Sequence, residues 1–229
     1  MQGQESLMKR LKCLLGFSGK KSKLKPQVHR CPKSAGGFSP SVLEVLVIDA
    51  SGSMADEDYK PTRLDGAKKA SSAFLKKLRD ARPEGLVAIV SFDTNAKVVC
   101  QPLPVKNELS RIETRVGSPK ADGFTNMASA LNLAGRIITK CSGARTARVL
   151  LLTDGHANEG GDPEPVAKKL KQFGVQLDII GIGGSPSEVN EEQLRRMASV
   201  VDGERRYWFI KNVPMLVKKF EALALREVK

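Results

Sequence analysis

This chain of 229 residues contains two histidines, and aromatic residues make up 5% of it. Histidine is the side chain that enzymes most often use for proton transfer near neutral pH. One of the two, His29, lies in a basic N-terminal stretch. No nucleophile with a neighbouring base can be assembled from the remaining residues. We therefore expect the chain not to be an enzyme.

Cysteines and long apolar runs are also scarce. The 4 cysteines show no Cys-x-x-Cys spacing, so we expect reduced thiols, as in a cytoplasmic protein. No apolar run approaches the roughly 20 residues that a membrane-spanning helix needs. The short apolar stretch near the N-terminus is interrupted by Lys12 and precedes no persuasive cleavage site, which argues against a signal peptide. These absences together predict a cytoplasmic location.

Three segments come close to enzyme signatures, and each lacks a required residue. Ser51 has no glycine two positions before it, as a nucleophile elbow requires. The segment 16–20, Gly-Phe-Ser-Gly-Lys, lacks the four-residue gap of a phosphate-binding loop. Pro186 stands where a dinucleotide fingerprint beginning at Gly181 needs its third glycine. These mismatches also favour a binding protein over an enzyme.

Positive charge is concentrated at the N-terminus. The chain carries a net charge of +13, and residues 1–40 hold nine Lys or Arg against Glu5 alone. We predict a basic, flexible segment and linker over residues 1–40 and a folded domain over residues 41–229. Such a segment could bind nucleic acid or an anionic lipid surface through charge. We favour a solvated tail, because its two aromatic residues offer little for bases to stack on.

From residue 42 onward, apolar strands alternate with amphipathic helices. Val45 to Ile48 is an unbroken apolar run, as expected of a parallel strand buried on both faces. The turn Asp93–Asn95 predicts a hairpin, so the strand that follows it should lie at the sheet's edge. The pattern predicts a Rossmann-like α/β fold: a doubly wound, mainly parallel sheet of about six strands, with one antiparallel edge strand and helices on both faces. Strands are expected at 42–49, 86–92, 96–103, 149–153, 175–182 and 206–210, and helices at 63–82, 109–116, 126–140, 165–173, 189–200 and 213–225.

Oxygen-bearing side chains follow two of these strands and precede one helix. Asp49, Ser51 and Ser53 alternate directly after the first strand, Asp154 follows the strand that ends at position 153, and Thr125 precedes the helix at 126–140. Loops at the carboxyl ends of parallel strands meet at one rim of the sheet. Oxygen-only ligands of this kind suit Mg²⁺ or Mn²⁺ better than zinc. Turn and helix-capping roles for the hydroxyls are the alternative.

These motifs, in this order, resemble those of the von Willebrand factor A domain, also called the integrin I domain. Asp-x-Ser-x-Ser is met by Asp49, Ser51 and Ser53, the family's lone threonine by Thr125, and its Thr-Asp-Gly by Asp154. The resemblance covers about residues 42–228 and implies a complete metal-ion-dependent adhesion site. It implies a Mg²⁺ or Mn²⁺ ion held by the hydroxyls, with the aspartates acting largely through water. It also implies a protein partner whose Asp or Glu fills the open coordination position.

The resemblance therefore predicts a metal-ion-dependent protein-binding module of the stand-alone, intracellular type. Its rival is charge-driven binding of nucleic acid or anionic lipid through residues 1–40. The acidic triplet Asp56, Glu57 and Asp58 allows two interpretations. In integrin β subunits, acidic residues at similar offsets serve a second ion, but a solvated acidic loop is the reading we favour here.

Overall fold

The computed structural model describes residues 42–141, 144–155 and 157–229. It contains a 6-stranded sheet in the order β3-β2-β1-β4-β5-β8, in which β3 alone runs antiparallel to its neighbour. This confirms the predicted fold class. The strands of this sheet are β1 (Val42–Asp49), β2 (Leu86–Phe92), β3 (Ala96–Pro104), β4 (Thr146–Thr153), β5 (Val175–Ile182) and β8 (Tyr207–Ile210).

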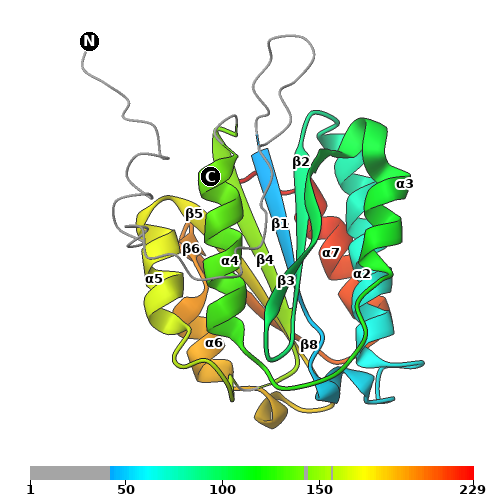
Figure 1. Ribbon diagram of the computed structural model, residues 1–229, viewed down its shortest axis with the longest axis vertical. Helices are drawn as coiled ribbons and strands as arrows, with labels where there is room; N and C mark the ends of the chain where they lie inside the picture. The colour runs from blue at the N-terminus through cyan, green and yellow to red at the C-terminus, as the bar shows by residue number, and fades with distance from the viewer. Residues whose placement is uncertain (1–41, 142–143, 156) are drawn as a thin grey trace, which may run out of the picture.

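Helices cover both faces of the sheet (Figure 1). One buried apolar cluster joins the sheet to α4, α5 and α6, and a second joins it to α2, α3 and α7. The helices are α2 (Arg63–Ala81), α3 (Val105–Val116), α4 (Met127–Lys140), α5 (Glu164–Gln172), α6 (Glu191–Met197) and α7 (Val213–Leu225). Short 3₁₀ helices η1 (Gly52–Ala55) and η2 (Pro186–Glu188) and a small pair of strands, β6 (Val200–Val201) and β7 (Glu204–Arg205), complete the described part.

The central strand β1 is buried along its whole length. It pairs in parallel with β2 on one side and β4 on the other, which explains its continuous apolar sequence. The hairpin between β2 and β3 turns at Asp93, whose Oδ1 accepts a 2.8 Å hydrogen bond from the Asn95 amide. This side-chain-to-backbone bond is what Asp contributes to a turn, and the predicted edge strand is confirmed.

Three element boundaries differ from those predicted by three residues or more. α3 begins at Val105, directly after β3 and ahead of the predicted position 109. β4 begins at Thr146, ahead of the predicted position 149, because residues 146–148 pair with the start of β1. The apolar pattern missed this part because Arg148 is charged, although it lies fully buried. The guanidinium is paired there with Glu44 and Asp178, at 2.7 and 3.5 Å. α6 ends at Met197 because the next residue has an extended backbone.

Cys141 is disulfide-bonded, whereas Cys100 is a free, buried cysteine. The expectation of four reduced thiols is therefore wrong for Cys141, and cysteine usage no longer supports a cytoplasmic location. None of the helices in the described ranges is long and apolar enough to cross a membrane. The predictions for residues 1–40 concern a segment outside these ranges.

Candidate metal centre

The two predicted aspartates reach the same rim because β1 and β4 are parallel neighbours. Ile48 is in register with Leu152, so the residues that follow them leave the sheet side by side. Asp49 ends β1, and Asp154 comes directly after β4. In Figure 1 this rim is the lower edge of the sheet, where η1 also lies.

Asp49 is fully buried and held by two hydrogen bonds. Its Oδ1 accepts from the Ser51 amide at 2.9 Å, and its Oδ2 accepts from Thr153 Oγ1 at 2.6 Å. Burial, together with the charge of Asp154, raises the pKa of this carboxyl from 3.8 to about 7. Desolvation disfavours the anion. A cation at the rim would therefore stabilise the ionised form of Asp49.

The hydroxyls of Ser51, Ser53 and Thr125 gather beside the aspartates. Ser51 Oγ lies 3.3 Å from Ser53 Oγ, and Ser53 Oγ donates a 2.9 Å hydrogen bond to Asp154 Oδ1. A Cβ atom built on Gly155 would lie 3.6 Å from Thr125 Oγ1 and 4.0 Å from Ser53 Oγ. Both hydroxyls thus border one glycine, and the structure brings all five predicted side chains to one rim. Their role as metal ligands stays a prediction.

Neither Ser51 nor Thr125 caps a helix with its side chain. Ser51 is the N-cap residue of η1, but its hydroxyl makes no capping hydrogen bond. At α4 the cap is Asn126, whose side chain accepts from the Ser129 amide at 2.9 Å. The helix-capping alternative is therefore not supported for these two hydroxyls, which remain available for a ligand.

Asn158 fixes the loop that carries Thr125. Its side-chain Oδ1 accepts from the Thr125 backbone amide at 2.7 Å, and its backbone amide donates to the Thr125 carbonyl at 3.2 Å. The neighbouring loop is tied to the rim as well, because the Gly52 amide donates to the Gly123 carbonyl at 3.0 Å. Thr125 itself is buried, with 2% of its surface exposed. Asn158 thus holds Thr125 in position through the backbone amide and carbonyl of Thr125.

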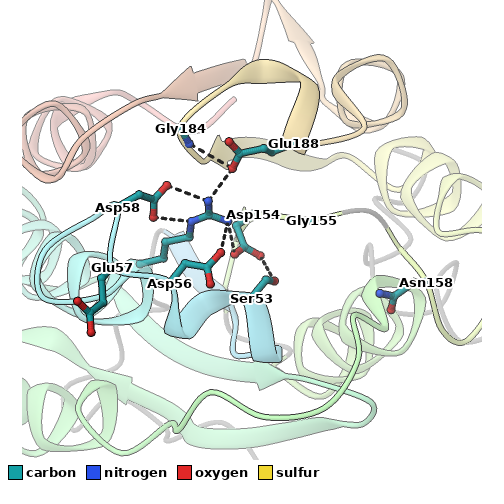
Figure 2. A pocket seen from close by; sticks show the side chains of 10 residues that line it. Ser53, Asp56, Glu57, Asp58, Asp154, Gly155, Asn158, Gly184 and Glu188 are labelled. Atoms are coloured by element: carbon teal, nitrogen blue, oxygen red, sulfur yellow. Dashed lines mark hydrogen bonds and ion pairs between the residues drawn. The ribbon is translucent and has the colours of Figure 1, made fainter.

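A pocket of about 730 Å³ opens beside Ser53, and acidic side chains around one guanidinium group line it. Figure 2 shows Asp56, Asp58, Asp154 and Glu188 gathered about that group, which belongs to Arg63 at the start of α2. The distances from Arg63 are 2.8 Å to Asp58, 2.6 Å to Glu188, 3.0 Å to Asp154 and 3.5 Å to Asp56. The hydrogen bond from Arg63 lowers the pKa of Asp58. The acidic triplet is therefore only partly solvated, because two of its members pair with Arg63.

The donor set fits a hard divalent cation. It offers three neutral hydroxyls and two carboxylates, the oxygen ligands that suit Mg²⁺ and Mn²⁺. In the described part of the chain, no group of three or more His, Cys, Asp or Glu side chains is placed to hold a metal. A zinc-type site is therefore not formed by those residues, and the hydroxyl-rich rim is the candidate centre.

The sequence analysis assigned no role to three residues that support the rim: Arg63, Thr153 and Asn158. The Thr-Asp-Gly motif offered a signal for Thr153, which immediately precedes Asp154 at the end of β4. In the sequence Arg63 is only the first residue of a helix. Its partner Asp58 lies five positions before it, but Asp154 and Glu188 lie 91 and 125 positions away. No local pattern points to such a contact.

The fold and the rim define a Rossmann-like α/β domain with a candidate ligand site at the carboxyl edge of its sheet. Comparison with known proteins identifies the family: the profile of the von Willebrand factor type A domain matches residues 45–222. The chain belongs to this family.

Its relatives include proteins without a described function. An Escherichia coli protein named "Uncharacterized protein YfbK" is 30% identical over 73% of this chain and 28% of its own length. A "UPF0353 protein" of Mycolicibacterium paratuberculosis is 28% identical over 70% of this chain and 53% of its own length. This chain thus spans about half of these curated relatives or less. A solved structure, "von Willebrand factor type A from Catenulispora acidiphila", superposes with a TM-score of 0.68, at 26% identity over 81% of this chain and 42% of that one.

Proposed function

We propose that this domain binds Mg²⁺ or Mn²⁺ at the rim and, through that ion, an Asp or Glu side chain of a protein partner. Domains of this family are commonly metal-dependent protein-interaction modules. The observation that carries the proposal is the position of the hydroxyls of Ser51, Ser53 and Thr125, two of which lie at helix starts without capping them. They gather beside two buried aspartates.

Each residue has a defined part in this proposal. Ser51, Ser53 and Thr125 would supply neutral oxygens to the ion, while Asp49 and Asp154 would balance its charge. The ion would supply a positive centre that attracts a carboxylate. Because the hydroxyls add no charge, two carboxylates at most offset the ion's two charges, and a third anion can still be attracted.

Phe124 adds an apolar contact beside the proposed ion. It precedes Thr125, and 59% of its surface is exposed. Its amide donates a 3.1 Å hydrogen bond to Thr94 Oγ1, so its backbone is held. An exposed aromatic ring next to a polar centre is typical of protein interfaces. This placement favours a protein partner over a free carboxylate.

We propose no catalytic role, and assign the hydroxyls of the candidate centre to the ion instead. Charge-driven binding through residues 1–40 remains the second candidate, on the strength of their +8 charge.

Retention of proteins on the immobilised full chain would separate the two candidates. Binding at the rim predicts retention in Mg²⁺ and release by EDTA, with little dependence on salt. Binding through the basic segment predicts the opposite pattern, a steep loss of binding with salt and no effect of EDTA. Retention that survives EDTA would contradict the rim proposal.

A further inference from the structure

Arg63 is placed to control one carboxylate of the candidate metal centre. Asp154 is buried, and each of its carboxylate oxygens has a separate partner. Oδ1 accepts from Ser53 Oγ at 2.9 Å, and Oδ2 accepts from Arg63 Nη1 at 3.0 Å. A carboxylate held at both oxygens has a single orientation, so Oδ1 faces the serine hydroxyls and Oδ2 faces away from them.

The guanidinium is itself held on its other side. Its Nε and Nη2 donate to the two oxygens of Asp58, each at 2.8 Å, and Nη2 also donates to Glu188 at 2.6 Å. The side chain of Arg63 is 7% exposed. Bidentate pairing of this kind fixes an arginine in position and direction. Arg63 therefore places a fixed positive charge in contact with Asp154.

The charges near the ion differ in how strongly water screens them. Asp49 and Asp154 are buried, whereas the side chains of Asp58 and Glu188 are 32% and 39% exposed. Exposed charges interact more weakly than buried ones. The electrostatics at the ion are thus dominated by two aspartates and one arginine, which leave a divalent cation with excess positive charge.

We propose that Arg63 is a positioning residue for the metal centre, resting on the function proposed above. It holds Asp154 by Oδ2, which keeps the second oxygen away from the ion. It also offsets part of the negative charge, so the bound ion keeps its attraction for a partner's carboxylate. Arg63 thereby weakens resting metal binding and strengthens carboxylate binding.

A purely structural role for Arg63 predicts a different outcome. If the arginine only tied loops together, its removal would loosen the rim and weaken both the metal and the carboxylate. If it positions Asp154 and supplies charge, its removal affects the two in opposite directions. The sign of each change therefore separates the two roles.

The test uses the full chain, with Mn²⁺ as the metal probe and acetate as the carboxylate probe. Mn²⁺ affinity is measured by calorimetry, and acetate binding by the ¹³C relaxation that bound Mn²⁺ induces. We expect Arg63→Met to bind Mn²⁺ about tenfold more tightly and acetate about tenfold more weakly. Arg63→Lys, which restores the charge without the fork, should return both values toward wild type.

Two further variants keep the test decisive if Arg63→Met does not fold. Glu188→Gln makes the surroundings of Arg63 less negative and should weaken Mn²⁺ about twofold while strengthening acetate. Arg79→Met is the control. It removes another arginine of α2, one whose side chain is 44% exposed, and its affinities for Mn²⁺ and acetate should match those of wild type.

Parallel loss of both probes in Arg63→Met, or an Arg63→Lys variant that behaves like Arg63→Met, would overturn the proposal. So would a Glu188→Gln variant with unchanged affinities. If the wild-type chain binds no Mn²⁺, the proposed function itself fails. If wild type binds Mn²⁺, and the Arg63 variants bind Mn²⁺ and acetate with the same affinities as wild type, only the proposed role of Arg63 fails.

Discussion

Ser53 and Asp154 are 101 positions apart in the sequence, yet Ser53 Oγ donates a 2.9 Å hydrogen bond to Asp154 Oδ1. The bond joins the turn after β1 to the turn after β4. It exists because these two strands are parallel neighbours with aligned carboxyl ends. This contact brings the two motifs, Asp-x-Ser-x-Ser and Thr-Asp-Gly, together in one candidate ion site.

The metal-free domain should lose stability as pH rises, because of Asp49. Its pKa is raised by burial from 3.8 in the unfolded chain to about 7 in the fold. A raised acid contributes stability that is fully present below the unfolded pKa and is lost as pH rises through the folded one. We expect the free energy of unfolding of wild type, relative to Asp49→Asn, to fall by about 3 kcal/mol between pH 5 and pH 8.

Urea unfolding in EDTA at several pH values measures this difference. Asp49→Asn is the reference because it keeps the shape of the side chain and cannot titrate, so contributions from other carboxylates cancel. A difference between the two proteins that does not change with pH would show that Asp49 is ionised throughout, contrary to its burial.

Thr125→Ala should weaken carboxylate binding while leaving the fold intact. Asn158 holds the loop through the Thr125 backbone, so the substitution removes only the hydroxyl and a methyl group. In our proposal the Thr125 hydroxyl supplies an oxygen to the ion that binds the carboxylate. We expect at least about a tenfold loss of acetate affinity in Mn²⁺, with a smaller loss of Mn²⁺ affinity.

Thr139→Ala is the matched control for Thr125→Ala. Thr139 is also buried, but its hydroxyl donates to the Arg136 carbonyl within α4. This variant should bind acetate as wild type does. Equal acetate binding by Thr125→Ala and wild type would remove Thr125 from the mechanism.

Phe124→Ser should weaken the binding of a protein partner without changing Mn²⁺ affinity. The ring is exposed beside Thr125 and makes a docking contact in our proposal. Loss of a central aromatic contact typically costs about 2 kcal/mol in binding. Met215→Ser, at a residue that is 52% exposed on α7, is the control. A partner captured on wild type that binds Phe124→Ser and Met215→Ser equally well would count against this surface.

Arg148→Met should destabilise the domain strongly and leave the metal centre unaffected. Arg148 is fully buried in β4 and pairs with Glu44 and Asp178. Removing one member of a buried ion pair leaves charge uncompensated and costs about 3–5 kcal/mol. Urea unfolding measures the loss, and Mn²⁺ calorimetry on the folded variant serves as the control. Glu44 also lies 3.4 Å from Arg82, and Asp178 lies 3.0 Å from Arg206. A loss below about 1 kcal/mol would mean that these two arginines suffice to neutralise the carboxylates.

The sequence predicted the fold and the rim because both follow from local patterns. Two local patterns predict strand ends: the apolar run that ends at Asp49, and the Thr-Asp-Gly at the end of β4. Because the two strands are parallel neighbours, these ends lie side by side. Arg63 and Arg148 escaped prediction for one shared reason. A buried arginine is stable only with acidic partners. Arg63 has two near partners in the chain, Asp56 and Asp58, but Asp154 and Glu188 lie 91 and 125 positions away. The partners of Arg148 lie 30 and 104 positions away. Periodicity carries no information about such pairs.

Calorimetric titration of the full chain with Mg²⁺ tests the central claim most directly, with wild type compared with a Ser51→Ala, Ser53→Ala double variant. The account predicts one ion per wild-type chain and little or no binding by the variant. It also predicts that wild type gains about 2.7 kcal/mol of stability when free metal is 100-fold above the dissociation constant. Absence of binding by wild type, or equal binding by the double variant, would contradict the account.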